Sequence, residues 1–556
     1  MRTVKRLFLV MAFSAMPLVG LAQSTTVTQV VDQTVAQERA EVDLLSHYSP
    51  LVETYIQNVK PDTRVGAVPD GDNYFLGRAE LAKSAAVEPL MGHIGFMHKM
   101  FPSLQSYVSR EFEFNPSGFL QMIYVDPKGL DRKHYKFDYV GRQFLGEVRC
   151  FVFDVDPLPG AGRGRFVGRI WVEDQDHHIV RFNGTYSGSS LLLGYYFNFD
   201  SWRTRAGNGQ WLPTFIYSEE GDVQNGRLKG TPLKAFKAQT RLWGYSLSPS
   251  VKEQELTTVS VDAETPVADA AEAADDFTPL QAERSWTRQA EDNVVEKMQR
   301  LGLMAPYGEV DKVLETVVNN LEVTNDLNIQ PDIRCRVLMT SAFESFTVGH
   351  TIVLSRGLID VIPDEATLAA VLAHEMGHIL LGQSLDSEYA FFNSLRFNEK
   401  DVFHHFGFGH TPEEEKGALR KATELLEKSP YKGSLGSAQL FLQALEKRSK
   451  DIPALISPHL GDRVTTDWEL DNGQGAAATP ANTEKNLIVA LPLGGRIKVE
   501  PWTDQLHMLK GKPTESVAEF EKMPFEVTPF FVYLTRQNDE SPRESRDSVA
   551  VKSDAN

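Results

Sequence analysis

Cysteine is nearly absent from the sequence. Only Cys150 and Cys335 occur among 556 residues, and they lie in different predicted domains. Two thiols cannot build the disulfide framework that holds many small secreted domains together, although a single bridge between domains remains an alternative. The chain must therefore be stabilised by hydrophobic cores, and its length predicts about two to four domains.

Basic residues are outnumbered by acidic ones. The chain has 57 Lys and Arg against 75 Asp and Glu, with a formal net charge of -18. Nucleic acids and anionic lipids attract basic surfaces, so this balance disfavours a nucleic-acid partner and direct binding to anionic lipid. No internal repeat of solenoid period is evident either, so an array of helical repeats is not expected.

The sequence also lacks a hydrophobic run of membrane-spanning length. Its N-terminal run, Leu7–Val19, follows a basic stretch and precedes the small-residue segment Gly20–Ala22. This run is shorter than the roughly 20 residues that a transmembrane helix needs. The pattern is typical of a secretory signal peptide over residues 1–22, so we predict a periplasmic or secreted protein with no transmembrane segment after cleavage.

The most specific pattern that is present is the pentapeptide His374–His378, with sequence His-Glu-Met-Gly-His. On a helix both histidines lie on one face, one turn apart, so both can bind one metal ion beside Glu375. Apolar residues from Leu368 to Leu380 indicate a buried helix, in which two histidines need a partner such as a metal. We predict one zinc ion per chain, with His374 and His378 as ligands and Glu375 as the general base.

The pentapeptide leaves the third ligand open. A metzincin would have His where this chain has Ser384, so that class is excluded. Glu388 and Glu399 remain alternatives in a stretch without clear periodicity. Glu415 is the better candidate, because a helix predicted to start at Thr411-Pro412 turns this carboxylate toward its apolar face. An inward carboxylate needs a cation, so we predict Glu415 as the third ligand.

Several segments around the pentapeptide share a pattern with known peptidases. They are Arg356-Gly-Leu358, Leu368–His378, Glu415-Lys-Gly-Ala418, Ser457-Pro-His459 and Arg463. From about Val310 to Arg463 the chain resembles the gluzincin zinc metallopeptidases of the HtpX and CAAX prenyl protease type, which include soluble periplasmic members of the BepA type.

The resemblance implies zinc-dependent endopeptidase activity on protein or peptide substrates. It implies the same ligands and base as above, and it adds His459 as a transition-state stabiliser supported by Arg463. The main departure is Leu419, where relatives have an Asp that orients a zinc-bound histidine. Losing such a partner typically costs about 10 to 100-fold in metal affinity or activity, unless Asp462 or another carboxylate replaces it.

Other features near the pentapeptide carry weaker predictions. Four histidines lack ligand spacing and are expected to face solvent or lie in loops: His350, His404, His405 and His410. The β-branched run from His350 to Leu354 predicts a strand that, at a sheet edge, could pair with a substrate backbone. The Phe-rich stretch Leu385–His410 is a candidate lid over the zinc, or equally ordinary core.

The N-terminal half has a different pattern, with successive aromatic and β-branched runs separated by turn residues between Tyr107 and Tyr245. The clearest runs are Phe144–Val155, Phe166–Val172, His178–Tyr186 and Tyr195–Trp202. They predict an antiparallel sheet or half-barrel. The region resembles the fold of LolA-like lipoprotein carriers, which implies a concave apolar face, but a packed sheet without ligand is an equal alternative.

These observations predict an α+β multidomain protein. Its expected parts are a signal peptide (1–22), a β-rich domain (40–250), an acidic linker (251–283), a mainly α zincin-type metallopeptidase domain with a short edge sheet (284–464), a polar insert (465–485), a β extension (486–536) and a disordered tail (537–556).

The predicted function is that of an exported zinc metalloendopeptidase, with quality control of envelope proteins as its expected role. The alternative is a periplasmic chaperone or carrier, whose N-terminal sheet binds a hydrophobic ligand or protein and whose zinc domain is weakly active. The sequence makes no prediction of the oligomeric state.

Overall fold

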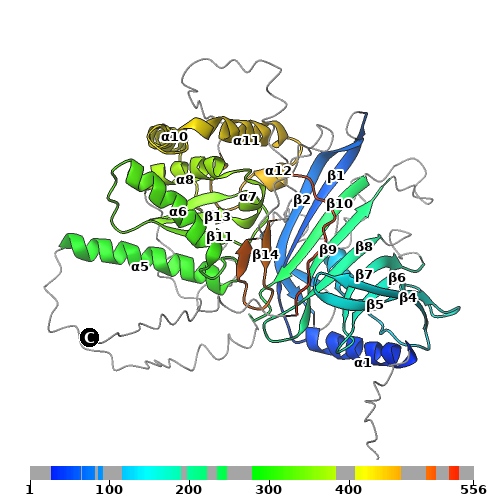
Figure 1. Cartoon of the computed structure of the whole chain (residues 1–556). Helices are drawn as coiled ribbons and strands as arrows, with labels where there is room; N and C mark the ends of the chain where they lie inside the picture. The colour runs from blue at the N-terminus through cyan, green and yellow to red at the C-terminus, as the bar shows by residue number, and fades with distance from the viewer. Residues whose placement is uncertain are drawn as a thin grey trace, which may run out of the picture.

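The structure is a computed structural model in which two bodies lie side by side, a large sheet and a mainly helical part (Figure 1). It describes residues 27–63, 66–81, 86–91, 116–188, 197–221, 235–246, 279–383, 407–464, 496–508 and 525–536. The predicted signal peptide, polar insert and tail lie outside these residues, as do most of the linker and of the candidate lid. Among the described residues, no helix is long and apolar enough to cross a membrane.

One ten-stranded sheet forms the N-terminal body, with strand order β3-β2-β1-β10-β9-β8-β7-β6-β5-β4. All neighbouring strands are antiparallel. The strands are β1 (Leu51–Asp62), β2 (Gly66–Glu80), β3 (Ala86–Met91), β4 (Tyr135–Leu145), β5 (Val148–Pro157), β6 (Phe166–Glu173), β7 (Ile179–Tyr186), β8 (Phe199–Arg205), β9 (Trp211–Glu220) and β10 (Ala235–Trp243). The predicted antiparallel sheet is confirmed.

The predicted strand boundaries differ in accuracy. The runs starting at Phe166 and His178 correspond closely to β6 and β7. The run Phe144–Val155 is instead a hairpin, because β4 ends at Leu145 and β5 starts at Val148. The turn between them is formed by Gly146 and Glu147, and Gly146 has a φ of +66°, which glycine adopts without strain.

At β1 both faces of the sheet are buried, and the sequence of this strand shows how. Leu51 and Tyr55 pack into the core shared with the helical part, whereas Val52 and Ile56 pack into a second core on the opposite face. Successive side chains of a strand point to opposite faces, which explains the alternation. The second core is completed by α1 (Val27–Leu45), α3 (Pro116–Leu120) and the 3-10 helix η2 (Gln121–Ile123).

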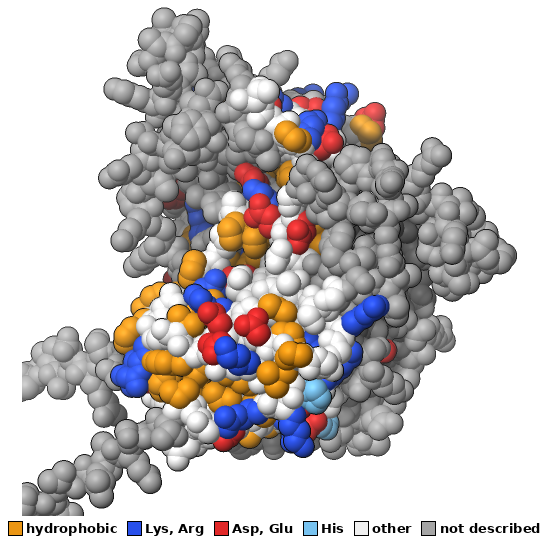
Figure 2. Space-filling model, turned by 90° about the vertical axis from the view of Figure 1, so that its right-hand side faces the viewer, with side chains coloured by type: hydrophobic (Ala, Val, Ile, Leu, Met, Phe, Trp, Pro, Cys, Tyr) orange, Lys and Arg blue, Asp and Glu red, His pale blue; other side chains and the backbone are white. Residues whose placement is uncertain are grey.

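Strand β4 ends the sheet on the side that faces the viewer in Figure 2, where hydrophobic side chains gather beside charged ones. Val140 and Phe144 on this strand are exposed. The strand also has a register shift between Tyr139 and Gly141 and an ion pair between Lys136 and Asp138. Bulges and charges of this kind are common protections of edge strands against pairing with other chains.

The helical body packs around a small sheet of order β11-β13-β12, in which β11 is parallel and β12 antiparallel to β13. Its elements are α5 (Pro279–Arg300), α6 (Glu309–Thr324), β11 (Arg334–Leu338), β12 (Ser345–Val348), β13 (Thr351–Ser355), α7 (Arg356–Val361), α8 (Glu365–Leu380), α10 (Pro412–Glu427), η4 (Lys432–Ser434), α11 (Leu435–Arg448) and α12 (Pro453–Ile456). The α+β fold class is confirmed.

One prediction about this small sheet is wrong. The run His350–Leu354 forms β13, which is the middle strand and is paired on both sides, so it has no free edge for a substrate. The edge strand beside α8 is β12, and its Ser345 forms a bridge with Asp462. The position of this run in the sequence did not indicate that its strand would be the central one of the small sheet.

Among the described C-terminal residues, β14 (Ile497–Val499) pairs with β15 (Leu506–Met508) in a short hairpin. Within the predicted β extension, residues 525–536 form no strand. The Gln57 side chain donates to the Phe525 carbonyl (2.6 Å) and accepts from the Val527 N–H (2.8 Å). A side chain of β1 thus provides the hydrogen bonds that a neighbouring strand would have supplied.

A buried carboxylate joins the two bodies. Glu53 on β1 accepts hydrogen bonds from the Arg356 guanidinium (3.0 Å), the Ser341 N–H (2.6 Å) and the Tyr74 hydroxyl (2.6 Å). On β2, Asp72 accepts from the first N–H groups of α12 at 2.9 Å each. The large sheet therefore fixes both α7 and α12 of the helical body.

Candidate metal centre

Helix α8 is built as the sequence predicts. Asp364 caps its start by accepting from the Thr367 N–H at 2.8 Å, and every residue from Ala366 to His378 is buried. Because this apolar helix is buried, the polar side chains of His374 and His378 in its last turns lie inside the protein. The predicted buried helix is confirmed.

Helix α10 carries the predicted third ligand in its first turn. Thr411 and Glu414 form a capping box, and Pro412 occupies the first turn. The helix packs closely on α8, because a Cβ at Gly377 would lie 2.5 Å from the Ala418 carbonyl oxygen. Only glycine allows this approach. The close packing brings Glu415 to the two histidines.

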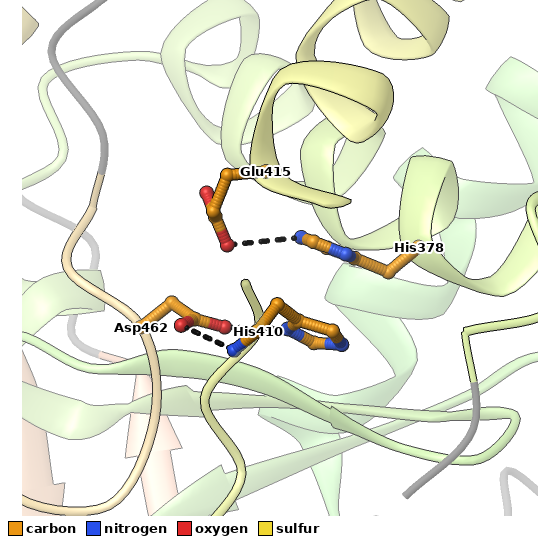
Figure 3. A group of neighbouring side chains, drawn as sticks. All are labelled: His378, His410, Glu415 and Asp462. Atoms are coloured by element: carbon orange, nitrogen blue, oxygen red, sulfur yellow. Dashed lines mark hydrogen bonds and ion pairs between the residues drawn. The ribbon is translucent and has the colours of Figure 1, made fainter. Parts of the chain in front are cut away.

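The three predicted ligands are brought together. His374 Nε2 lies 3.2 Å from Glu415 Oε2, and His378 Nε2 lies 3.4 Å from Glu415 Oε1. The histidine rings are perpendicular, with centroids 4.8 Å apart. Figure 3 shows Glu415 directed at the His378 ring. Two imidazole nitrogens and a carboxylate converge on one point, as zinc ligands do.

The donor atoms at this point fit a cation. His378 Nε2 and Glu415 Oε1 are buried and have no hydrogen-bond partner. Buried polar atoms are normally paired, so this arrangement suits a bound ion between them. Burial lowers the pKa of His374, but the carboxylates of Glu375 and Glu415 outweigh it and raise the pKa to about 9. Burial raises the pKa of Glu415, but both histidines hold it well below its usual range.

The predicted general base lies beside this group. Glu375 is buried, and its Oε1 lies 3.5 Å from His374 Nδ1. Its carboxylate is therefore close to one ligand and inside the low-dielectric region where a base is effective.

His410 is more closely involved than the spacing predicted. It lies in a loop, but its side chain is only 11% exposed and its ring stacks on His378 at 3.8 Å. Asp462 holds it through Nδ1 (2.5 Å) and the backbone N–H (2.8 Å). The prediction that His410 lies in a loop is confirmed, and Asp462, 52 residues later, holds its ring beside His378.

Four side chains have possible ligand atoms within 4.8 Å of one another: His378, His410, Glu415 and Asp462 (Figure 3). This set overlaps the predicted one in two members. Asp462 already accepts two hydrogen bonds from His410, whereas Glu415 bridges His374 and His378. The two histidines of α8 with Glu415 remain the predicted ligand set.

The predicted transition-state residues make other contacts. The His459 ring stacks on Tyr74 of the large sheet at 5.0 Å, and its backbone N–H donates to Glu344. Burial lowers the pKa of His459. Arg463 pairs with Glu446 at 3.4 Å and is 44% exposed. These contacts join neither residue to the three ligands.

One residue of the site was missed by the sequence analysis. The side chain of Gln383 lies beside His378, with Oε1 2.5 Å from Nδ1. The residue at the departure from the family pattern, Leu419, instead packs against the hydrophobic core. The alternative ligands Glu388 and Glu399 lie outside the described residues. A polar residue directly after the helix-ending Gly382 was the signal that could have found Gln383.

Two solved structures are similar to part of the chain. A domain described as an outer membrane lipoprotein-sorting protein from Vibrio parahaemolyticus is 9% identical, covers 38% of this chain and 91% of its own, and has a TM-score of 0.17. A DUF1329 family protein from Desulfovibrio piger is 12% identical, with coverages of 39% and 90% and a TM-score of 0.18. These scores are too low to add to the fold described above.

No curated protein sequence matches the chain. Residues 307–398, however, match the family described as Peptidase family M48. This segment contains the small sheet, α7 and α8 with the pentapeptide. The match indicates a metallopeptidase and ends before α10. Residues 307–398 of the chain are therefore similar to peptidase family M48.

Proposed function

We propose that the chain is an exported zinc-dependent endopeptidase that hydrolyses peptide bonds of protein substrates. The observation that carries the proposal is the convergence of His374, His378 and Glu415 at distances of 3.2 and 3.4 Å on two closely packed helices. The match to a peptidase family over α8 supports it independently.

The residues present fit the proposed chemistry. When bound at such a site, zinc acts as a Lewis acid and lets water act as a nucleophile near neutral pH. Glu375 would accept the proton of the attacking water on a carboxylate oxygen and pass it to the leaving amine. The roles of His459 and Arg463 as stabilisers of the transition state remain predictions. In the structure the His459 ring stacks on Tyr74, and Arg463 pairs with Glu446.

The carrier alternative gains no support from the packing of the sheet. On the face turned away from the peptidase, Val30, Phe119 and Ile123 share one hydrophobic core with the strands. The helices α1, α3 and η2 therefore occupy a face that a hydrophobic ligand would need. The proposed role of the sheet is to support the peptidase and to recruit substrate, with misassembled envelope proteins as the proposed targets.

Metal content and cleavage of an unfolded protein test this function together. The chain without residues 1–22 and its Glu375→Gln variant should each bind one zinc ion, and only the first should cleave casein. Zinc binding without cleavage in either protein would contradict the endopeptidase, and absence of zinc would contradict the metal centre. Cleavage that persists in Glu375→Gln would contradict the role of the base.

A further inference from the structure

Helix α8 ends in a turn that folds the chain back over the metal centre. The Gln383 N–H donates to the His378 carbonyl at 3.1 Å, and the Gly382 N–H donates to the Ile379 carbonyl at 3.0 Å. Gly382 has a φ of +67°, the left-handed conformation that glycine adopts without strain. These paired hydrogen bonds form the Schellman motif that ends many helices. The motif places the Gln383 side chain beside the ring of His378.

Contacts on both sides define how the Gln383 amide is oriented. Its Nε2 points to the Glu414 carbonyl oxygen at 3.5 Å, which can only accept a hydrogen bond. Its Oε1 therefore faces His378 Nδ1, at 2.5 Å. A carbonyl oxygen accepts, so Nδ1 of His378 must carry the proton and donate it.

The position of that proton determines what the other ring nitrogen can do. In a neutral imidazole with the proton on Nδ1, Nε2 has a free lone pair. His378 Nε2 is the atom that lies 3.4 Å from Glu415 Oε1 and has no hydrogen-bond partner. The Gln383 amide thus selects the tautomer in which Nε2 is ready to bind a metal ion.

We propose that Gln383 is the positioning residue of the metal centre. It holds the ring angle and tautomer of His378 through its side-chain carbonyl oxygen. Residues hydrogen-bonded to metal-binding histidines are usually carboxylates, backbone carbonyls or water, and they increase the basicity of the ligand. A neutral amide holds the ring but contributes less basicity than a carboxylate. The inference rests on the proposed zinc site.

Three variants test this role against wild type. Gln383→Leu removes the acceptor and keeps the bulk, Gln383→Glu restores an acceptor with a negative charge, and Leu381→Ala changes a 47% exposed residue at the same helix end as a control. The readouts are the zinc dissociation constant from competition with a chelator, the visible spectrum of the Co²⁺-substituted protein, and the Tm of the metal-free protein.

Zinc binding should weaken by about 10 to 100-fold in Gln383→Leu, which is the usual effect of losing such a partner. Gln383→Glu should bind zinc at least as tightly as wild type, and Leu381→Ala should be unchanged. The Co²⁺ spectrum should change in Gln383→Leu alone, with the metal-free Tm of all variants close to wild type.

Equal weakening in Gln383→Leu and Gln383→Glu, or wild-type affinity in Gln383→Leu, would overturn the inference. If either result is found and the wild-type protein still binds zinc and cleaves casein, the role of Gln383 is wrong but the proposed function stands. Wild-type protein that binds no zinc would overturn both.

Discussion

Two carboxylates in this protein have opposite surroundings: Glu53 is buried, whereas the Glu415 side chain is 20% exposed. Glu53, between the large sheet and the helical body, accepts hydrogen bonds from Arg356, Ser341 and Tyr74. Glu415 faces His374 and His378, and its Oε1 has no hydrogen-bond partner. Burying a charge is costly unless it is paired, so the protein satisfies the first carboxylate, whereas the second keeps one oxygen without a hydrogen-bond partner.

The comparison separates structural from functional polar groups. A buried ion pair such as Glu53–Arg356 fixes how two bodies meet, although it adds little net stability over apolar packing. A buried group with converging, unsatisfied donor atoms indicates a binding site. His410 lies between these two cases. Its Nδ1 is hydrogen-bonded to Asp462, and its ring stacks on His378.

The largest effect is expected from breaking the unsatisfied cluster. Glu415→Gln keeps the size of the side chain and removes the charge between the two histidines. We expect zinc affinity and casein cleavage to fall by more than the roughly 100-fold that losing an outer-shell partner costs. Metal analysis and cleavage assays on the purified variant check this. Glu413→Gln, in the same exposed first turn, is the matched control.

Breaking the satisfied cluster should cost stability instead of metal binding. Glu53→Ala leaves the Arg356 guanidinium buried without its carboxylate, which typically costs about 3 to 5 kcal/mol. Urea unfolding measures the loss. Arg169→Ala breaks an exposed pair with Asp154 and should have a far smaller effect. Similar losses in both variants would mean that Glu53 is not an essential contact.

The buried carboxylate of Glu344 should make stability depend on pH. Burial raises the pKa of Glu344 from 4.5 to about 7, although the N–H of His459 partly opposes this. The folded state therefore holds this proton more tightly than the unfolded state. The resulting stability is fully present below pH 4.5 and is lost as the pH rises through about 7.

Glu344→Gln removes this dependence, since glutamine stays neutral. The variant should be more stable than wild type by up to about 3 kcal/mol at pH 8 and nearly equal to it at pH 4. Unfolding curves at the two pH values check the difference. A constant difference between the proteins would show that Glu344 does not titrate in this range.

A smaller effect is expected from separating the two helices of the metal centre. Gly377→Ala adds a methyl group that would lie 2.5 Å from the Ala418 carbonyl oxygen. Overpacking of this kind costs about 1 to 3 kcal/mol. Zinc affinity should fall as well, because α10 moves away with Glu415. Gly436→Ala, where a Cβ meets nothing within 4 Å, is the control for added helix propensity.

Features that depend on neighbouring residues were predicted from the sequence, whereas contacts between residues far apart in the chain were not. Helices α8 and α10 follow from local signals: an apolar stripe, the capping box at Thr411 and the proline after it. Contacts that link distant segments did not follow. The central position of β13 depends on strands from both sides, and the hydrogen bond of Glu53 to Ser341 joins residues 288 apart.

The site was predicted in the same uneven way. His374 and His378 have a fixed helical spacing, and Glu415 had an inward face to identify it. Gln383 and the pair of His410 with Asp462 depend on how a helix end and two loops fold over the ligands. Spacing in the sequence does not predict the path of a helix end or of a loop, so these residues were identified only from the structure.

Anomalous diffraction at the zinc absorption edge, from crystals of the mature chain grown with zinc, tests the central claim most directly. The account predicts one strong peak between His374 Nε2, His378 Nε2 and the Glu415 carboxylate. A peak bound by His410 and Asp462 without His374, or no peak at all, would contradict it.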